Sequence, residues 1–408
     1  MSLFDMVTRL VIRRRLSRTS FPLLGALLLA GCDMSIIPAD AIMHPTPENL
    51  PPPGGPLIRA DTVLQGSGSE ARALEWAQVR RALLDATTVV EIGSESVPGP
   101  ELFGVIADVT RDDDGNVYVL DGSVGEVRVF DASGAFVASF GGEGQGPDEF
   151  RSAEKLVVLS DRRAVIGDHG GPAKVFAPSG GGYELVGPLL RDRPSAALQV
   201  DDMCSVGDRM FVHSRNLVDP NGDSLVIHEV SPDGGDVIGS LAEAYRSEFA
   251  RDRTVRSFGT VACAEEPVSI VYGNYYFPIV KAYAPDGMQL WTALIEDHTQ
   301  APIYQNNPSQ STVDPRGFPS EYIYSIQAGR RGLLVLQTAL YETVGEGEDR
   351  EWRVVRRSTY LVDGATGEGG LVSDSLPTIS WMGDSTFVAE WSFPYPRIEV
   401  RVMGPTGS

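Results

Sequence analysis

Histidine and cysteine, two residue types that often perform chemistry in enzymes, number five and three in this chain of 408 residues, and their spacing matches no catalytic motif. None of its five histidines stands in an HExxH or comparable metal-ligand spacing, so a zinc enzyme is not predicted. A GxSxG motif for a nucleophilic serine is also missing. These patterns favour a protein without chemistry of its own, although they leave catalysis open.

One glycine-rich stretch, GGEGQGPDEF at residues 141–150, has the composition of a phosphate-binding loop. A nucleotide fingerprint places its glycines between a strand and the start of a helix. Here strand-like segments stand on both sides, so the phosphate hypothesis fails. The shorter echo GPELF at 99–103 predicts instead a turn that glycine permits and proline stiffens. Phe150 is then expected to fill a seam between structural units.

Acidic residues dominate the charge of the chain, which has 34 Lys+Arg and 55 Asp+Glu. Residues 1–31 hold five arginines and one aspartate, so their removal leaves 29 basic and 54 acidic residues and a net charge of −25. Such a surface repels nucleic acid phosphates, and nucleic acid is not a predicted partner.

The N-terminus predicts export and a lipid anchor. The basic segment RLVIRRRLSR at 9–18 is followed by the apolar run FPLLGALLLA at 21–30, which is too short to span a bilayer and is typical of a signal peptide. LAGC at 29–32 resembles the lipobox of bacterial lipoproteins. The resemblance implies cleavage after residue 31, lipid on Cys32 and attachment to the inner or outer membrane of a bacterial cell envelope.

Two further segments precede the main domain. Residues 32–69 are rich in proline and show no hydrophobic period, which predicts a disordered tether. Residues 70–86 have apolar residues at helical spacing and predict one short helix.

From residue 87 to 408 the chain consists of short alternating runs separated by turn residues, which predicts an all-β domain. A turn that ends in glycine recurs six times: VFDASG (129–134), VFAPSG (175–180), EVSPDG (229–234), AYAPDG (282–287), LVDGATG (361–367) and VMGPTG (402–407). The spacing suits a six-bladed β-propeller of four-stranded blades. Because the last blade lacks a fourth strand, TTVVEIG at 87–93 is predicted to complete it and close the ring.

The segment GNVYVLDGSVGEVRVFDASGAFVASFGGEGQGPDEF, residues 115–150, resembles the NHL-repeat kind of six-bladed propeller found in bacterial lipoproteins. Propellers of this kind include binding modules, lyases and lactonases. The lactonases hold a divalent metal such as calcium with carboxylates in the central channel. Candidates on the predicted innermost strands are Asp108, Glu154, Asp201 and Asp202. The Asn and Glu partners that this family requires are not matched, and buried channel carboxylates also occur for structural reasons.

Cys204 and Cys263 lie near the ends of what are predicted to be the first strands of consecutive blades. Neighbouring inner strands can bring such residues together, and an exported chain meets an oxidising compartment. A disulfide between them is at least as well supported as two thiols.

Aromatic residues concentrate in loops that a propeller places on one face: Tyr275, Tyr276, Phe277, Trp391, Phe393 and Tyr395. Beside acidic loops they suit stacking on sugar rings or gripping a peptide, but they also suit capping of the blade ends. The resulting hypothesis is a membrane-anchored binding module for a protein, peptide or glycan, with no cofactor. The alternative is a propeller hydrolase or lactonase with calcium or another divalent cation in the channel.

Overall fold

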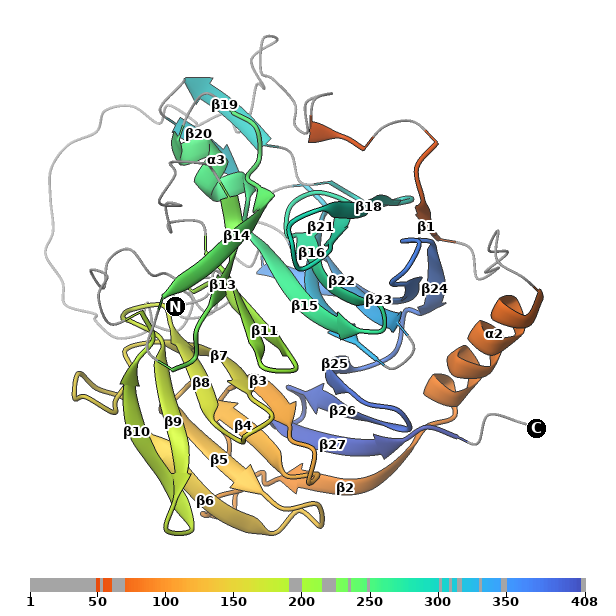
Figure 1. Ribbon diagram of the computed structural model, residues 1–408. Helices are drawn as coiled ribbons and strands as arrows, with labels where there is room; N and C mark the ends of the chain where they lie inside the picture. The colour runs from red at the N-terminus through yellow and green to blue at the C-terminus, as the bar shows by residue number, and fades with distance from the viewer. Residues whose placement is uncertain are drawn as a thin grey trace, which may run out of the picture.

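The computed structural model describes residues 49–51, 54–60, 70–190, 200–214, 225–233, 236–247, 250–300, 303–307, 310–313, 318–329, 332–345 and 351–404. Cys32, the predicted signal peptide and most of the predicted tether lie outside this part of the chain. The described residues are mostly β-strands, arranged in sheets around a central axis (Figure 1). The predicted all-β class is therefore confirmed.

The first three sheets follow one another along the chain, and each has four antiparallel strands. Blade 1 consists of β3 (Ile106–Arg111), β4 (Val117–Asp121), β5 (Glu126–Phe130) and β6 (Phe136–Gly141). Blade 2 consists of β7 (Ala153–Val158), β8 (Ala164–Asp168), β9 (Lys174–Ser179) and β10 (Gly182–Pro188). Blade 3 consists of β11 (Asp202–Val206), β12 (Arg209–His213), β13 (Leu225–Val230) and β14 (Val237–Glu243).

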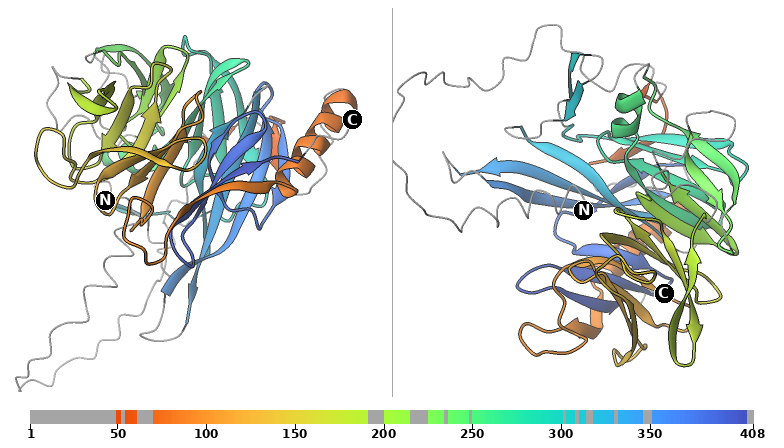
Figure 2. Two further views of the ribbon diagram at one scale, coloured as in Figure 1. Left: turned by 90° about the horizontal axis from the view of Figure 1, so that it is seen from below. Right: turned by 90° about the vertical axis from the view of Figure 1, so that its left-hand side faces the viewer.

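The next two blades are larger. Blade 4 consists of β15 (Gly259–Glu265), β16 (Val268–Asn274), β17 (Ile279–Tyr283) and β18 (Gln289–Ile295). Blade 5 consists of β21 (Ser320–Ala328), β22 (Leu333–Val344), β23 (Glu351–Asp363) and β24 (Gly369–Ser373). The long β22–β23 hairpin extends beyond the body of the ring (Figure 2). A separate hairpin, β19 (Ile303–Asn307) and β20 (Gln310–Val313), precedes blade 5.

Blade 6 joins the two ends of the described domain. It consists of β25 (Thr378–Met382), β26 (Thr386–Trp391), β27 (Arg397–Val402) and, as its outer strand, β2 (Thr87–Gly93). Ile92 of β2 pairs with Ile398 of β27 and is 1% exposed, whereas Val89 on the same strand is 57% exposed. The strand predicted to complete the last blade is thus the one that pairs there.

The innermost strands close the ring. Strands β3, β7, β11, β15, β21 and β25 each contact the next, and β25 contacts β3. The described strands therefore form six four-stranded blades around an axis, which is a β-propeller (Figure 1).

One short strand was not predicted. β1 (Leu57–Arg59) lies between β18 of blade 4 and β24 of blade 5 and pairs with both, so that these two blades form one nine-stranded sheet. The expectation of a disordered tether through residue 69 is wrong for these residues, because their backbone is paired on both sides.

Two helices accompany the strands. α2 (Glu70–Leu84) covers most of the stretch in which a helix was expected. Its Leu83 is fully buried against blade 5 and blade 6, and Arg80 donates a hydrogen bond to the carbonyl of Val372 at 3.2 Å. α3 (Ala250–Arg256) follows β14 of blade 3 in the chain and precedes β15 of blade 4. Neither helix has the length and apolar character that crossing a bilayer would require.

The two GPxxF loops lie at seams between blades and share one packing arrangement. Arg128 donates a hydrogen bond to the carbonyl of Leu102 at 2.7 Å, and its guanidinium carbon lies 5.4 Å from the centroid of Phe103. Lys174 donates to the carbonyl just before Phe150 and lies 4.9 Å from that ring. Phe150 is 1% exposed. The glycine-rich stretch therefore packs a phenylalanine between blades, and a cation from the following blade holds the loop.

Candidate functional site in the central channel

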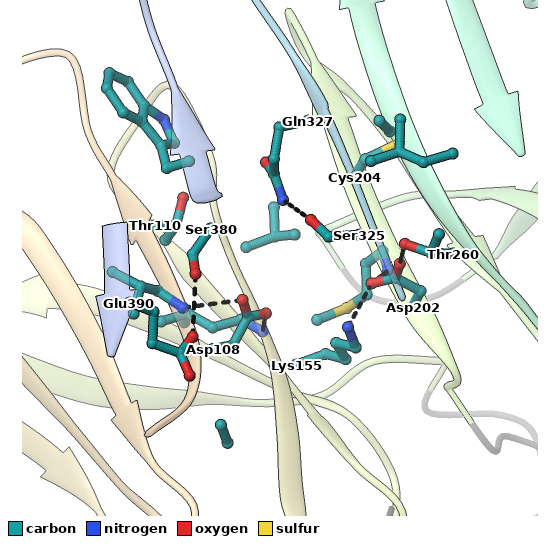
Figure 3. Close-up of a pocket in the computed structure, with 18 of the residues that line it drawn as sticks. Asp108, Thr110, Lys155, Asp202, Cys204, Thr260, Ser325, Gln327, Ser380 and Glu390 are labelled. Carbon is teal, nitrogen blue, oxygen red and sulfur yellow. Dashed lines mark hydrogen bonds and ion pairs between the residues drawn. The ribbon is translucent and has the colours of Figure 1, made fainter. Parts of the chain in front are cut away.

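The innermost strands of all six blades line a cavity of about 1200 Å³ along the propeller axis. Figure 3 shows charged and polar side chains converging on it from several blades. A concave site of this size with a few convergent polar groups is where a ligand is most often bound. We therefore take the channel as the candidate site.

A shared irregularity of the inner strands places the polar residues. Each of four inner strands contains one extra residue: Ala107 in β3, Glu154 in β7, Tyr324 in β21 and Ser380 in β25. Such a bulge breaks the alternation of side chains and changes the direction of those that follow. Asp108, Lys155 and Ser325 come directly after three of these bulges, and all three side chains reach the cavity (Figure 3).

The most highly bonded carboxylate in the channel is that of Asp202 on β11. Lys155 of blade 2 lies 3.3 Å away, measured from Nζ to Oδ1. Thr260 of blade 4 donates its hydroxyl to Oδ2 at 2.6 Å, and the backbone amide of Val261 donates to the same oxygen at 2.9 Å. Asp202 thus connects three blades, and both of its oxygens have donors.

Lys155 is the cation of this group. Burial alone would lower the pKa of its ammonium, but the charges of Asp202 and Asp108 outweigh burial and raise the pKa. The ammonium is therefore charged at neutral pH. It has three N–H donors, and Asp202 is the ion-pair partner that the described residues supply.

Asp108 of β3 plays a similar linking role between blades 1 and 2. Its Oδ1 accepts the amide of Val109 at 2.9 Å, and its Oδ2 accepts the amide of Leu156 in the next blade at 2.8 Å. Burial raises the pKa of Asp108 to about 6, although Lys155 and the Leu156 amide partly offset that rise.

Glu390 of β26 faces the same space with fewer partners. Ser380 donates its hydroxyl to Oε2 at 3.1 Å. Burial raises the pKa of Glu390 to about 7, and the negative charge of Asp108 adds to the rise while Arg357 and Lys155 oppose it. Near neutral pH this carboxyl can act as either a donor or an acceptor of hydrogen bonds.

The four acids predicted as possible metal ligands do not form a metal site. Both oxygens of Asp108 and both oxygens of Asp202 already accept hydrogen bonds. The buried carboxylate of Asp201 lies beside His213, with 3.6 Å between Oδ2 and Nδ1. Glu154 accepts a hydrogen bond from Ser152 at 3.3 Å. Within the described ranges no three His, Cys, Asp or Glu side chains converge as metal ligands would. The donor set therefore does not fit the divalent cation that the lactonase resemblance implies.

The aromatic residues predicted as a binding face divide into two groups. Tyr276 is 4% exposed and Phe277 is fully buried, and both pack with Tyr322 in the core between blades 4 and 5. The prediction of a surface role is wrong for these two, because they fill the interior. Tyr275 instead lines the cavity, where its ring centroid lies 4.9 Å from that of Phe258.

The second aromatic group belongs to blade 6. The guanidinium carbon of Arg397 lies 5.0 Å from the ring centroid of Trp391 and 5.5 Å from that of Tyr395. Phe393, at the turn between them, is 83% exposed. These rings therefore stack on a cation at the outer part of the blade, while Phe393 projects into solvent.

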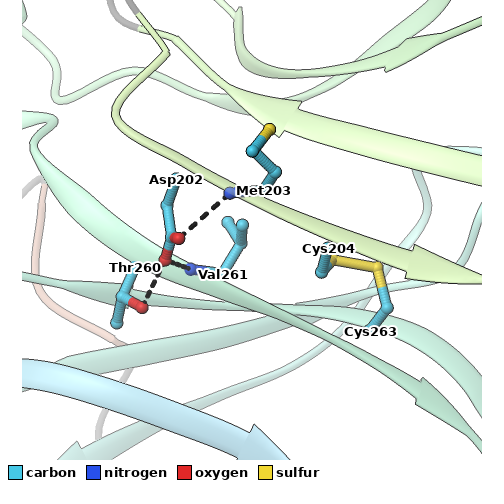
Figure 4. Close-up of a disulfide and its surroundings, with 6 residues drawn as sticks. All are labelled: Asp202, Met203, Cys204, Thr260, Val261 and Cys263. Atoms are coloured by element: carbon cyan, nitrogen blue, oxygen red, sulfur yellow. Dashed lines mark hydrogen bonds between the residues drawn. A yellow bond between two sulfur atoms is a disulfide. The ribbon is translucent and has the colours of Figure 1, made fainter. Parts of the chain in front are cut away.

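A disulfide joins Cys204 of β11 to Cys263 of β15, with 5.5 Å between their Cα atoms (Figure 4). The same two strands supply Asp202 and Thr260, so the covalent link and the hydrogen bond hold the same part of the channel wall. This bond fixes the spacing of blades 3 and 4 beside the charged groups.

Sequence reasoning missed Lys155, Glu390, Ser380 and Thr260 as channel residues. The signal that could have identified Lys155 is its place in its strand, since the third residue of AEKLVV matches Asp108 in IADVTR. Glu390 lies on a second strand, where no inner-strand pattern predicts a channel residue.

No protein-family model matches the chain, and no curated protein matches it. Solved structures do resemble it. A member of the DUF4221 family from Bacteroides vulgatus is 7% identical, with a TM-score of 0.50 over 78% of this chain and 98% of that one. A protein from Bacteroides fragilis described as exported is 11% identical (TM-score 0.48, 78% and 95%), and a streptogramin B lyase is 12% identical (TM-score 0.43, 79% and 99%). At 7% identity the DUF4221 structure shows a likeness of fold alone.

Proposed function

We propose that the protein is a cell-envelope lipoprotein, anchored through lipid on Cys32, whose propeller binds a ligand in its central channel without chemical conversion. The anchor is supported by the signal segment and LAGC at 29–32. The binding role is supported by the polar cavity that all six blades line.

The observation that carries the binding role is that two side chains in the channel, Lys155 and Glu390, have capacity for further hydrogen bonds. Asp108 and Asp202 use their oxygens to hold neighbouring blades together, which gives them a structural role. Lys155 offers N–H donors beyond its contact with Asp202, and Glu390 has a pKa of about 7, which lets it accept or donate.

Of the three ligand classes considered, protein, peptide and glycan, a glycan fits this channel best. Sugar hydroxyls both donate and accept hydrogen bonds, as do the lining groups Ser325, Gln327 and Ser380. Tyr275 and Phe258 line the same cavity and supply apolar surface that can contact the carbon atoms of a sugar ring. A short chain end that enters the channel would meet both kinds of contact.

The alternative of a metal-dependent hydrolase or lactonase has weaker support. Its carboxylates would have to leave their present hydrogen bonds, and Asp201 would have to leave His213. We therefore derive no reaction step for it. Calorimetric titration with calcium tests this alternative directly.

The test of the binding role uses the full-length protein in detergent on arrays of oligosaccharides and synthetic peptides. We expect binding to a subset of oligosaccharides and at least a tenfold loss in Lys155→Met. Lys281→Met serves as the matched control, because Lys281 lies on β17 outside the channel. Equal binding by Lys155→Met and wild type would place the ligand elsewhere.

The anchor has its own test. We expect the purified N-terminal peptide to start at Cys32 and to carry the mass of lipid, and Cys32→Ala to appear in the soluble fraction. An unmodified cysteine at this position would refute the anchor without affecting the binding experiment.

A further inference from the structure

The seam between blades 4 and 5 differs from the other seams of the propeller because a separate strand fills it. β1 lies at the outer rim between β18 and β24 (Figure 1). It runs parallel to both, with Ile58 opposite Ile295 on one side and opposite Gly369 on the other. Adjacent blades diverge toward the rim of a propeller, and here the gap has the width of one strand.

Backbone hydrogen bonds hold β1 along its length. The amide of Leu294 donates to the carbonyl of Pro56 at 3.2 Å, and the amide of Glu296 donates to the carbonyl of Ile58 at 2.9 Å. Without β1, both amides would lie on the outer edge of blade 4.

One side chain anchors the strand. Ile58 is fully buried, in a core shared by both blades that includes Ile295 and Val362. The neighbouring Arg59 is exposed. Burying an isoleucine stabilises a protein by roughly 1.5–3 kcal/mol, which is large for a segment of three residues.

The two blades also contact each other directly beside β1. The indole Nε1 of Trp291 in blade 4 donates to the carbonyl of Gly364 in blade 5 at 2.7 Å. The groove that receives β1 is therefore held at a fixed width by residues outside the strand.

We propose that this seam is the point at which the membrane anchor is attached to the propeller. The inference rests on the proposed lipid on Cys32. Only 24 residues separate Cys32 from Pro56, whereas 38 separate it from Glu70, where α2 begins. At about 3.3 Å per extended residue, the clamp limits the reach of the propeller to roughly 80 Å instead of roughly 125 Å. On its N-terminal side the described chain makes one more contact with the propeller, where the side chain of Asn49 donates to the carbonyl of Arg246 at 3.2 Å and accepts the Arg246 amide at 2.9 Å.

The experiment compares full-length wild type, Ile58→Asp and the matched control Arg59→Asp, all in detergent. Both variants introduce the same carboxylate on the same strand, one inside the core and one in solvent. We expect the amides of Leu294 and Glu296 to exchange hydrogen at least 100-fold faster in Ile58→Asp and at the wild-type rate in Arg59→Asp. Equal exchange in all three proteins would overturn the clamp.

A second measurement covers the case in which Ile58→Asp does not fold. A specific protease site inserted between β1 and α2 allows the folded wild-type chain to be cut. We expect the N-terminal piece to stay bound through gel filtration, and its immediate release would overturn the proposal. Exchange of that piece between molecules within minutes would also overturn it, because a clamp must hold its own chain.

Membrane binding separates this proposal from the one on which it rests. On supported bilayers we expect the protein layer of Ile58→Asp to extend up to about 45 Å farther than that of Arg59→Asp. If neither protein binds the bilayer but the exchange rates differ as expected, the lipid anchor fails and β1 remains a structural strand. If both bind with equal extension, the anchor stands and the clamp fails.

Discussion

Replacing Glu390 by glutamine should make the protein more stable at pH 8. Glu390 is held beside Asp108 in the channel, and burial together with that charge raises its pKa to about 7 from an ordinary value of 4.5. Above pH 7 the carboxylate is charged in both the folded and unfolded states, and the folded state bears the desolvation. Glutamine keeps an oxygen for the Ser380 hydroxyl and removes the charge.

The size of the effect follows from the shift. A difference of about 2.5 pKa units corresponds to about 3 kcal/mol at most. With an unfolding entropy of about 2.1 cal/mol/K per residue, a domain of roughly 300 residues gains up to about 5 °C in Tm. The stability gain of Glu390→Gln should shrink as the pH falls. Below pH 4.5 both states of the wild type are protonated, so the advantage of Glu390→Gln should vanish.

The control lies on the adjacent strand. Burial would raise the pKa of Glu399, but hydrogen bonds from Arg401 and Thr88 and the Arg401 charge lower it instead. Its contribution is present above the ordinary pKa and is lost as the pH falls. Glu399→Gln should therefore destabilise the protein at pH 8, the opposite of Glu390→Gln.

The assay is denaturant unfolding of both variants and wild type from pH 4 to pH 8. A lower stability of Glu390→Gln at pH 8, or a gain that persists at pH 4, would refute the assigned burial of this carboxyl. If Glu390→Gln is more stable but binds the ligand more weakly, then Glu390 lowers the stability of the protein and contributes to ligand binding, as residues of binding sites often do.

Three further predictions concern the framework of the propeller. Ile92→Ala should cost 2–5 kcal/mol in unfolding free energy (approximately, as for buried aliphatic side chains) and Val89→Ala on the same strand under about 1 kcal/mol, and equal losses would contradict closure by β2. Replacing Cys204 and Cys263 together by serine should lower the free energy of unfolding by about 2–4 kcal/mol, since the bond closes a loop of 59 residues, and an unchanged urea midpoint would contradict this. Lys174→Met should speed hydrogen exchange in residues 142–150 by removing the ammonium that donates to the carbonyls of Gly146 and Glu149, and unchanged exchange would contradict the clamping role.

Much of the fold could be predicted because it repeats. The recurring turn and the echo of GPDEF in GPELF revealed the blade as the unit, and the missing final strand led directly to β2. β1 was not predictable in the same way. Its three residues have no counterpart in the other blades, and a strand that pairs with residues more than 200 positions away leaves no local pattern.

The channel was predicted only in part. Asp108 and Asp202 were correctly placed on inner strands, because short strands with a known order fix which residues approach the axis. The sequence could not show that their oxygens are occupied by amides of the next blade, because such contacts depend on the spacing between blades. For the same reason Tyr276 and Phe277 looked like surface residues, although they pack against Tyr322 of blade 5 in the core.

The seams of this propeller are held by different devices. Phe150 and its cation fill the seam of blades 1 and 2, Lys155 and Asp202 join blades 2 and 3, and a disulfide joins blades 3 and 4. β1 fills the next seam, and β2 completes blade 6. Because the polar groups of the channel come from different blades, a shift of one blade would separate donors from acceptors there. Separate contacts at successive seams hold these groups in place before a ligand binds. This lowers the conformational-entropy cost of binding.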